Sequence, residues 1–241
     1  MARLKAFIWP YVVFSVVILG VAPVMTPFLK VMELLDIHTH RLDDKNRQSI
    51  INCSPVEFFP QQGCYYSVGI HPWNVTSSLN QEWEALKRAA IHPQVLAIGE
   101  AGLDNLTSAS FSLQKEIFRA QITLAEKVNK PLIIHSVRTS NEILELKKEY
   151  SPRNPWIIHG FRGKKAIARK FLEQGIYLSF GEKYQIEALQ VVPLNCLFIE
   201  TDESLVEILA LYKTVAVNIS LPFEKLIEQV QQNIRQLFFR E

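Results

Sequence analysis

A short apolar run ends in two histidines in the stretch Leu34-Leu-Asp-Ile-His-Thr-His40. We predict a buried strand over 34–38, because a short β-rich apolar run is typical of a strand covered on both faces. His38 and His40 are two positions apart and would project from the same side of this strand, so both imidazoles could reach one ion. A buried run that ends in polar, chemically active side chains recurs along the chain, and this pattern decides the fold prediction.

From Met32 onward, short apolar runs alternate with longer amphipathic runs. The expected strands cover 34–38, 49–53, 65–70, 95–99, 132–135, 156–159, 176–180 and 197–200. The expected helices cover 81–91, 112–129, 141–150, 164–174, 182–189, 205–217 and 222–239. Buried strands separated by helices indicate a parallel sheet, and eight of them predict an α/β fold, a single-domain TIM-type (β/α)8 barrel over 32–241. The first βα units are shortened, since the first three strands are too close together for full helices.

Composition excludes several classes of protein. The chain has 241 residues, of which 48% are hydrophobic and 10% aromatic, so it is not disordered. Three cysteines without a CxxC spacing argue against a disulfide framework and favour a reducing, cytoplasmic compartment. Basic residues number 26 and acidic residues 24, and Arg3, Lys5 and Lys30 lie in the first 31 positions. Any nucleic-acid partner would therefore be held by metal or local charge rather than by a basic surface.

The N-terminal segment 1–31 is strongly hydrophobic. Residues 6–29 carry no charge and follow Arg3 and Lys5, which is the pattern of a membrane anchor. A cleaved signal peptide or a mis-assigned upstream start would produce the same pattern. We expect the natural start to be Met32, because only about two residues separate the apolar run from the first strand, too few for a linker. The alternative localisation is a membrane-anchored protein held through 6–29.

Polar residues of one chemical kind collect at the ends of the expected strands. In a parallel barrel these ends form the active-site face. Taken alone, Asp202 could cap a helix and His71 could be a turn residue. Together, so many unpaired polar groups in an apolar enclosure would be costly without a metal ion. The collected residues are His38, His40, His71, Glu100, His135, His159 and Asp202.

Six of these residues, all except His71, supply more nitrogen and oxygen ligands than one tetrahedral ion needs, so we predict two divalent metal ions. Glu100 is the natural bridge between them, because a carboxylate can join ions about 3.5–4 Å apart. Imidazole and carboxylate ligands without cysteine suit Mg, Mn, Zn, Fe or Co. Ions of this kind activate a water molecule and stabilise an oxyanion, which is the chemistry of hydrolysis.

Six short motifs occur in order along the chain. They are Asp36-Ile-His-Thr-His-Arg41, Gly69-Ile-His-Pro72, Ala97-Ile-Gly-Glu-Ala-Gly-Leu-Asp104, Pro131-Leu-Ile-Ile-His135, Ile158-His-Gly-Phe161 and Glu200-Thr-Asp202. Together they resemble the TatD family of metal-dependent hydrolases in the amidohydrolase superfamily. Gln114, Gln121 and the strand Gly175-Ile-Tyr-Leu-Ser-Phe-Gly181 add to the resemblance, which covers essentially 32–241.

The resemblance implies a TIM barrel with two divalent ions and phosphodiesterase activity on DNA, commonly exonucleolytic, on single strands or ends. It implies that Asp202 accepts the proton of the attacking water and that His71 faces the substrate phosphate. Its metal assignment gives one ion to His38, His40 and Asp202, the second to His135 and His159, and the bridge to Glu100.

The sequence departs from the family pattern in the substrate region. No proline follows Glu200-Thr-Asp202, and Asn105 stands where an aromatic residue is common. The segment between His40 and Gly69 is short. These departures leave substrate identity less defined than the metal site.

Residues outside the ligand set are candidates for substrate binding. Arg162 and Lys164 follow His159 and would contact phosphate at a helix N-terminus. Trp73 and Phe161 would either stack an unpaired base or pack in the core. A hydrolase of small esters, amides or lactones is the first alternative function, and a membrane-tethered, non-catalytic metal-binding protein is the second. The sequence indicates no obligate protein partner.

Overall fold

A computed structural model describes residues 34–41 and 49–239. The hydrophobic segment 1–31 and the expected start at Met32 lie outside these residues. In the described part of the chain, none of the helices combines the length and the apolar character that a bilayer crossing requires.

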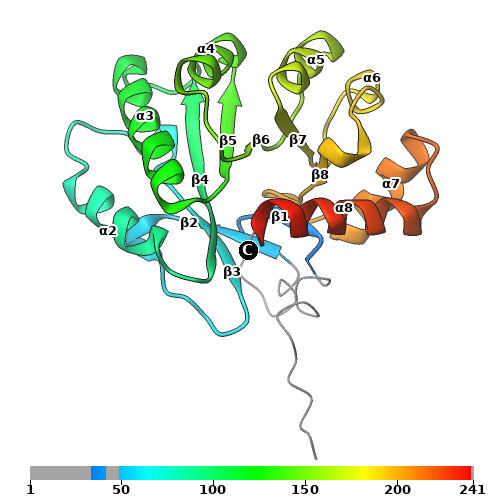
Figure 1. Ribbon diagram of the computed structural model, residues 1–241, viewed down its shortest axis with the longest axis horizontal. Coiled ribbons are helices and arrows are strands. Elements are labelled where there is room, and N and C mark those ends of the chain that lie inside the picture. Colours follow the sequence, from blue (N-terminus) through cyan, green and yellow to red (C-terminus); the bar gives the residue numbers. More distant parts are fainter. Residues whose placement is uncertain (1–33, 42–48, 240–241) are drawn as a thin grey trace, which may run out of the picture.

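Eight parallel strands run in the order β1 to β8, and the helices surround them (Figure 1). Neighbouring strands are hydrogen-bonded throughout the series, and a parallel bridge between Thr39 and Asp202 joins the two ends of the sheet. The predicted (β/α)8 barrel is therefore confirmed. The strands are β1 (Asp36–Thr39), β2 (Ser49–Cys53), β3 (Tyr65–Val68), β4 (Val95–Asp104), β5 (Leu132–Val137), β6 (Trp156–Ile158), β7 (Ile176–Phe180) and β8 (Leu197–Ile199).

The helices follow the predicted pattern with shifted ends. They are α2 (Asn80–Ala90), α3 (Phe111–Val128), α4 (Ser140–Tyr150), α5 (Lys165–Glu173), α6 (Ile186–Leu189), α7 (Ile208–Asn218) and α8 (Phe223–Phe238), with 3-10 turns η2 (Pro55–Glu57), η3 (Pro72–Asn74) and η4 (Leu194–Cys196). Only η2 connects β2 to β3, as the short spacing predicts. Helix α7 begins three residues later than expected, and Leu205 is exposed. Asp202 is therefore not its cap.

A buried polar network holds the closing edge of the barrel. The Asp36 carboxylate accepts hydrogen bonds from the His38 and Thr201 amides, both at 3.1 Å, and from Thr201 Oγ1 at 2.6 Å. The Asp202 amide donates to the His38 carbonyl at 2.9 Å, and the Asp202 carbonyl accepts from the His40 amide at 3.1 Å. Asp36 thus fixes the chain after β8 against β1, which brings Asp202 beside the two histidines.

Strand β4 is longer than predicted, because it continues past Gly99 to Asp104. Its pairing with β5 shifts register between Ile98 and Ala101. Gly102 lies in this stretch with a φ of +151°, a conformation that side chains disfavour, and its Cα faces the His135 backbone. The absence of a side chain at 102 therefore allows β4 to approach β5 at the histidine.

We expect Gly102→Ala to destabilise the protein by about 3 kcal/mol or more, because the new Cβ would overlap the His135 backbone oxygen in a strained conformation. Urea unfolding followed by circular dichroism measures this effect. The matched control is Gly181→Ala, whose Cβ would meet its nearest neighbour at 3.7 Å, an ordinary contact. Equal stability of the two variants would contradict the close approach of β4 to β5.

Candidate metal centre

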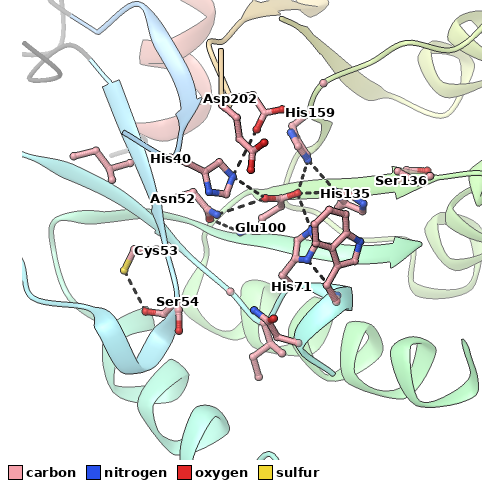
Figure 2. Close-up of a pocket in the computed structure, with 18 of the residues that line it drawn as sticks. His40, Asn52, Cys53, Ser54, His71, Glu100, His135, Ser136, His159 and Asp202 are labelled. Atoms are coloured by element: carbon pink, nitrogen blue, oxygen red, sulfur yellow. Dashed lines mark hydrogen bonds and ion pairs between the residues drawn. The ribbon is translucent and has the colours of Figure 1, made fainter. Parts of the chain in front are cut away.

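The Glu100 carboxylate is the centre of a cluster of imidazoles at the carboxyl ends of the strands, and Figure 2 shows His40, His71, His135 and His159 around it. His38 is the fifth imidazole of the cluster. It extends from β4, and Asn52 of β2 accepts a hydrogen bond from its backbone amide at 2.8 Å. The imidazole nitrogens that approach a Glu100 oxygen are His135 Nδ1 and His159 Nε2 at 2.7 Å, His71 Nε2 at 3.1 Å, His40 Nε2 at 3.3 Å and His38 Nε2 at 3.5 Å.

The charges of this cluster are strongly coupled. Burial alone would raise the pKa of Glu100, but His159 and His135 outweigh it and hold the pKa well below its usual range. Burial would lower the pKa of His159, yet the facing Glu100 raises it well above its ordinary value. The hydrogen bond to Glu100 likewise raises the pKa of His40. The site therefore keeps an ionised carboxylate in a buried position, where a divalent cation would be attracted.

Asp202 faces the same cluster from the segment after β8. Its Oδ1 lies 3.8 Å from His38 Nε2 and 3.6 Å from His40 Nε2. Its side chain is 24% exposed, whereas Glu100 is 4% exposed. Asp202 is therefore the carboxylate of the cluster that water reaches more easily.

Two glutamines of α3 position the ends of β3 and β4. Gln121 accepts from the Ile70 amide at 2.8 Å and donates to the Ile70 carbonyl at 3.0 Å. Gln114 makes the same pair of bonds with Asp104, at 2.8 and 3.1 Å. The two glutamines are seven residues apart and thus on one face of the helix. They fix the backbone next to His71 and at the end of β4.

Two further carboxylates orient the histidines from behind. Asp104 Oδ2 lies 3.0 Å from His135 Nε2, and Glu200 Oε1 lies 3.3 Å from His159 Nδ1. The Gly160 amide donates to Glu200 at 2.6 Å. Metal-binding imidazoles commonly hold such a partner on the second nitrogen. Sequence reasoning assigned neither Asp104 nor Glu200 a role, although both stand inside the quoted motifs.

The donor set fits a divalent metal. Three groups of side chains each bring their ligand atoms within 4.8 Å of one another, and Glu100 belongs to two of them. His38 is fully buried, its Nδ1 makes no hydrogen bond within the described residues, and its Nε2 faces Glu100 and Asp202 only at 3.5 and 3.8 Å, beyond good hydrogen-bond distance. Such an orphaned group costs about 1–3 kcal/mol unless a partner is supplied, and a cation would supply it. The groups are His38–His40–Glu100, His38–His159–Asp202 and His71–Glu100–His135.

The other candidate residues divide into those beside the cluster and those away from it. His71 caps η3 through Nδ1, which accepts from the Trp73 amide at 3.2 Å, so it is a turn residue as well as a neighbour of Glu100. Arg162 lies 4.0 Å from Asp202 Oδ2. Lys164 is exposed before α5 and is not among the described residues that line the cavity, whereas Arg162 is. Phe161 is buried against Phe171 and Phe180.

A cavity of about 1350 Å³ opens above the cluster. Its floor includes Glu100 and four of the five histidines, and its walls include Trp73, Arg138 and Arg162. This volume exceeds the ~300–1,000 Å³ typical of sites for small molecules. His92, the sixth histidine, lies elsewhere, in contact with Phe58.

Fold and site together define a parallel (β/α)8 barrel with a mixed imidazole–carboxylate metal centre at the carboxyl ends of its strands. The chain belongs to the TatD-related DNase family, whose pattern matches residues 54–239. This family is the one that the sequence motifs resemble.

Individual relatives agree with this placement. A stretch of 147 residues is 35% identical to the uncharacterized metal-dependent hydrolase YabD of Bacillus subtilis, over 57% of this chain and 58% of that protein. The 3'-5' ssDNA/RNA exonuclease TatD of Klebsiella pneumoniae is 30% identical over 58% of this chain and 57% of its own. The chain therefore spans less than two thirds of the curated relatives it matches. The crystal structure of YJJV, a TatD homologue from Escherichia coli, has the same fold, with a TM-score of 0.74 and 20% identity over 88% of this chain and all of that one.

Proposed function

We propose that the protein is a divalent-metal-dependent phosphodiesterase that degrades DNA at single strands or ends. The observation that carries the proposal is the convergence of five imidazoles on one buried carboxylate at the floor of a large open cavity. Relatives named as a 3'-5' ssDNA/RNA exonuclease and, in Schizosaccharomyces pombe, as a deoxyribonuclease support the choice of substrate.

Two ions are proposed, and Glu100 would bridge them. Such ions supply an activated water and a clamp for the charge that develops on the phosphate. His38, His40 and Asp202 would hold one ion, and His135 and His159 the other. His71 belongs to one of the three ligand groups, together with Glu100 and His135. It would therefore serve either as a metal ligand or, as the family resemblance implies, as a contact for the substrate phosphate.

The chain's own residues would handle the proton and the phosphate. Asp202 is partly exposed and held by its backbone against β1, and it would accept the proton of the attacking water. Arg162 is beside it and 62% exposed, free to turn its guanidinium toward a phosphate oxygen. The first alternative, a hydrolase of small esters, amides or lactones, would use the same residues, but the cavity is larger than such a substrate needs.

We expect excess chelator to abolish hydrolysis by the full-length protein and Mg, Mn or Co to restore it, because the ions supply both nucleophile and charge clamp. The assay uses end-labelled single-stranded DNA, duplex DNA and RNA, with elemental analysis of the same samples. Full activity in excess chelator without bound metal would refute the metal-dependent function. Hydrolysis of small esters alone would favour the alternative.

A further inference from the structure

Trp73 is a large aromatic side chain that is both exposed and rigidly held. The residue is 63% exposed and lines the cavity. Its indole Nε1 donates to Asp104 Oδ2 at 2.7 Å, and its backbone amide donates to His71 Nδ1 at 3.2 Å. Asp104 is 2% exposed, so the ring is tied to a buried carboxylate. Packing alone does not explain why an exposed ring is fixed in one orientation.

This ring lies directly beside the metal centre. Its centroid is 5.1 Å from that of His71 in an edge-on arrangement and 6.2 Å from that of His135. Both histidines contact Glu100. A group that rests on the ring is therefore adjacent to a phosphate held above Glu100.

The rest of the cavity wall supplies cations and one further exposed ring, Phe59, which follows η2. Arg138 and Arg162 are exposed and line the same cavity. An aromatic surface combined with cations is the arrangement that binds single-stranded nucleic acid, with bases on the rings and phosphates on the cations. Phe161 is buried and offers no such surface.

We propose that Trp73 is the stacking platform for an unpaired nucleobase next to the phosphate that is cut, and that it selects single-stranded ends. This inference rests on the proposed function. A paired base within a duplex is stacked on its neighbours and does not present a free face, whereas an unpaired terminal base does. Because hydrogen bonds fix the ring before binding, stacking a base on it costs little side-chain entropy.

The test is a binding cycle in excess EDTA, where hydrolysis is absent. Fluorescence anisotropy measures the affinity of the full-length protein for labelled eight-nucleotide oligo-dT and for the same oligonucleotide with an abasic residue at either end. We expect Trp73→Leu to weaken binding of intact oligo-dT by about 5- to 150-fold, the range for one base–aromatic stack. Wild type should bind at least one of the abasic oligonucleotides more weakly than intact oligo-dT, by a similar factor. For that abasic oligonucleotide, Trp73→Leu should lower the affinity by less than about twofold relative to wild type.

Two more variants separate stacking from structural support. Trp73→Phe keeps an aromatic face but loses the bond to Asp104, and it should bind oligo-dT within about threefold of wild type. Ile91→Ala is the control, because Ile91 is exposed at the end of α2 and outside the cavity lining. Three results would contradict the stacking role. Trp73→Leu could weaken binding of intact and abasic oligonucleotides equally, Trp73→Phe could weaken binding as much as Trp73→Leu, or wild type could fail to bind. If Trp73→Leu weakens binding as expected while the metal-loaded protein hydrolyses no nucleic acid, the proposed function fails, and Trp73 is a binding surface for an unpaired base without a phosphate that is cut beside it.

Discussion

Replacing Glu100 with glutamine is expected to weaken metal binding at least ~100-fold. Loss of a residue that merely orients a metal ligand costs ~10–100-fold, and Glu100 belongs to two of the three ligand groups. The amide has the same shape but removes the one charge that all five imidazoles approach. Hydrolysis should fall with the metal. Equilibrium dialysis with Mn, read by elemental analysis, measures the affinity directly.

The control for this variant is Glu84→Gln, which removes an exposed carboxylate on α2 whose partner is Lys87. Its metal content and activity should match wild type. Without Glu100, the pKa of His159 should also fall toward its usual range, because the facing carboxylate is what raises it. A Glu100→Gln protein that folds and retains both ions would show that Glu100 is not the bridge.

The fold was predictable because its strands are buried on both faces. Segments such as 132–135 and 176–180 are mostly apolar, have the length of a strand and lie between helices. A parallel sheet with helices on both sides is the arrangement that buries such segments. The site was predictable for the same reason, since parallel strands deliver their carboxyl ends to one face. Five histidines could therefore be placed together without knowing any distance between them.

The residues that orient the site were harder to find. Asn52 is an ordinary polar residue near a strand end, and its contact with Glu100 arises only when β2 and β4 curve into the barrel. Asp104 could have been proposed from the sequence, because it comes four residues after Glu100. Its partners Trp73 and His135 could not, because they lie on other elements. The choice between base stacking and core packing for Trp73 and Phe161 also depended on tertiary contacts, and the structure separates the two residues.

Replacing Asp202 with asparagine is expected to lower kcat by about 100- to 10,000-fold, the usual contribution of a positioned general base. The affinity for an oligonucleotide should change less than about tenfold, because the amide keeps the shape of the side chain while losing its proton affinity and charge. The backbone of residue 202 should stay in place, since it is held by hydrogen bonds to His38 and His40 rather than by the carboxylate. Single-turnover kinetics on end-labelled single-stranded DNA measure the rate, and anisotropy measures the binding.

His92→Ala is the control for this variant. His92 is a histidine of the same chain, yet it contacts Phe58 and lies outside the lining of the metal cavity. Its loss should leave kcat within about twofold of wild type, because surface substitutions away from a site are usually small in effect. An inactive His92→Ala beside a normal Asp202→Asn would place the active face at the opposite end of the barrel. Equal losses in rate and in binding for Asp202→Asn would instead make Asp202 a residue that holds substrate, because a proton acceptor acts in the transition state and leaves ground-state affinity nearly unchanged.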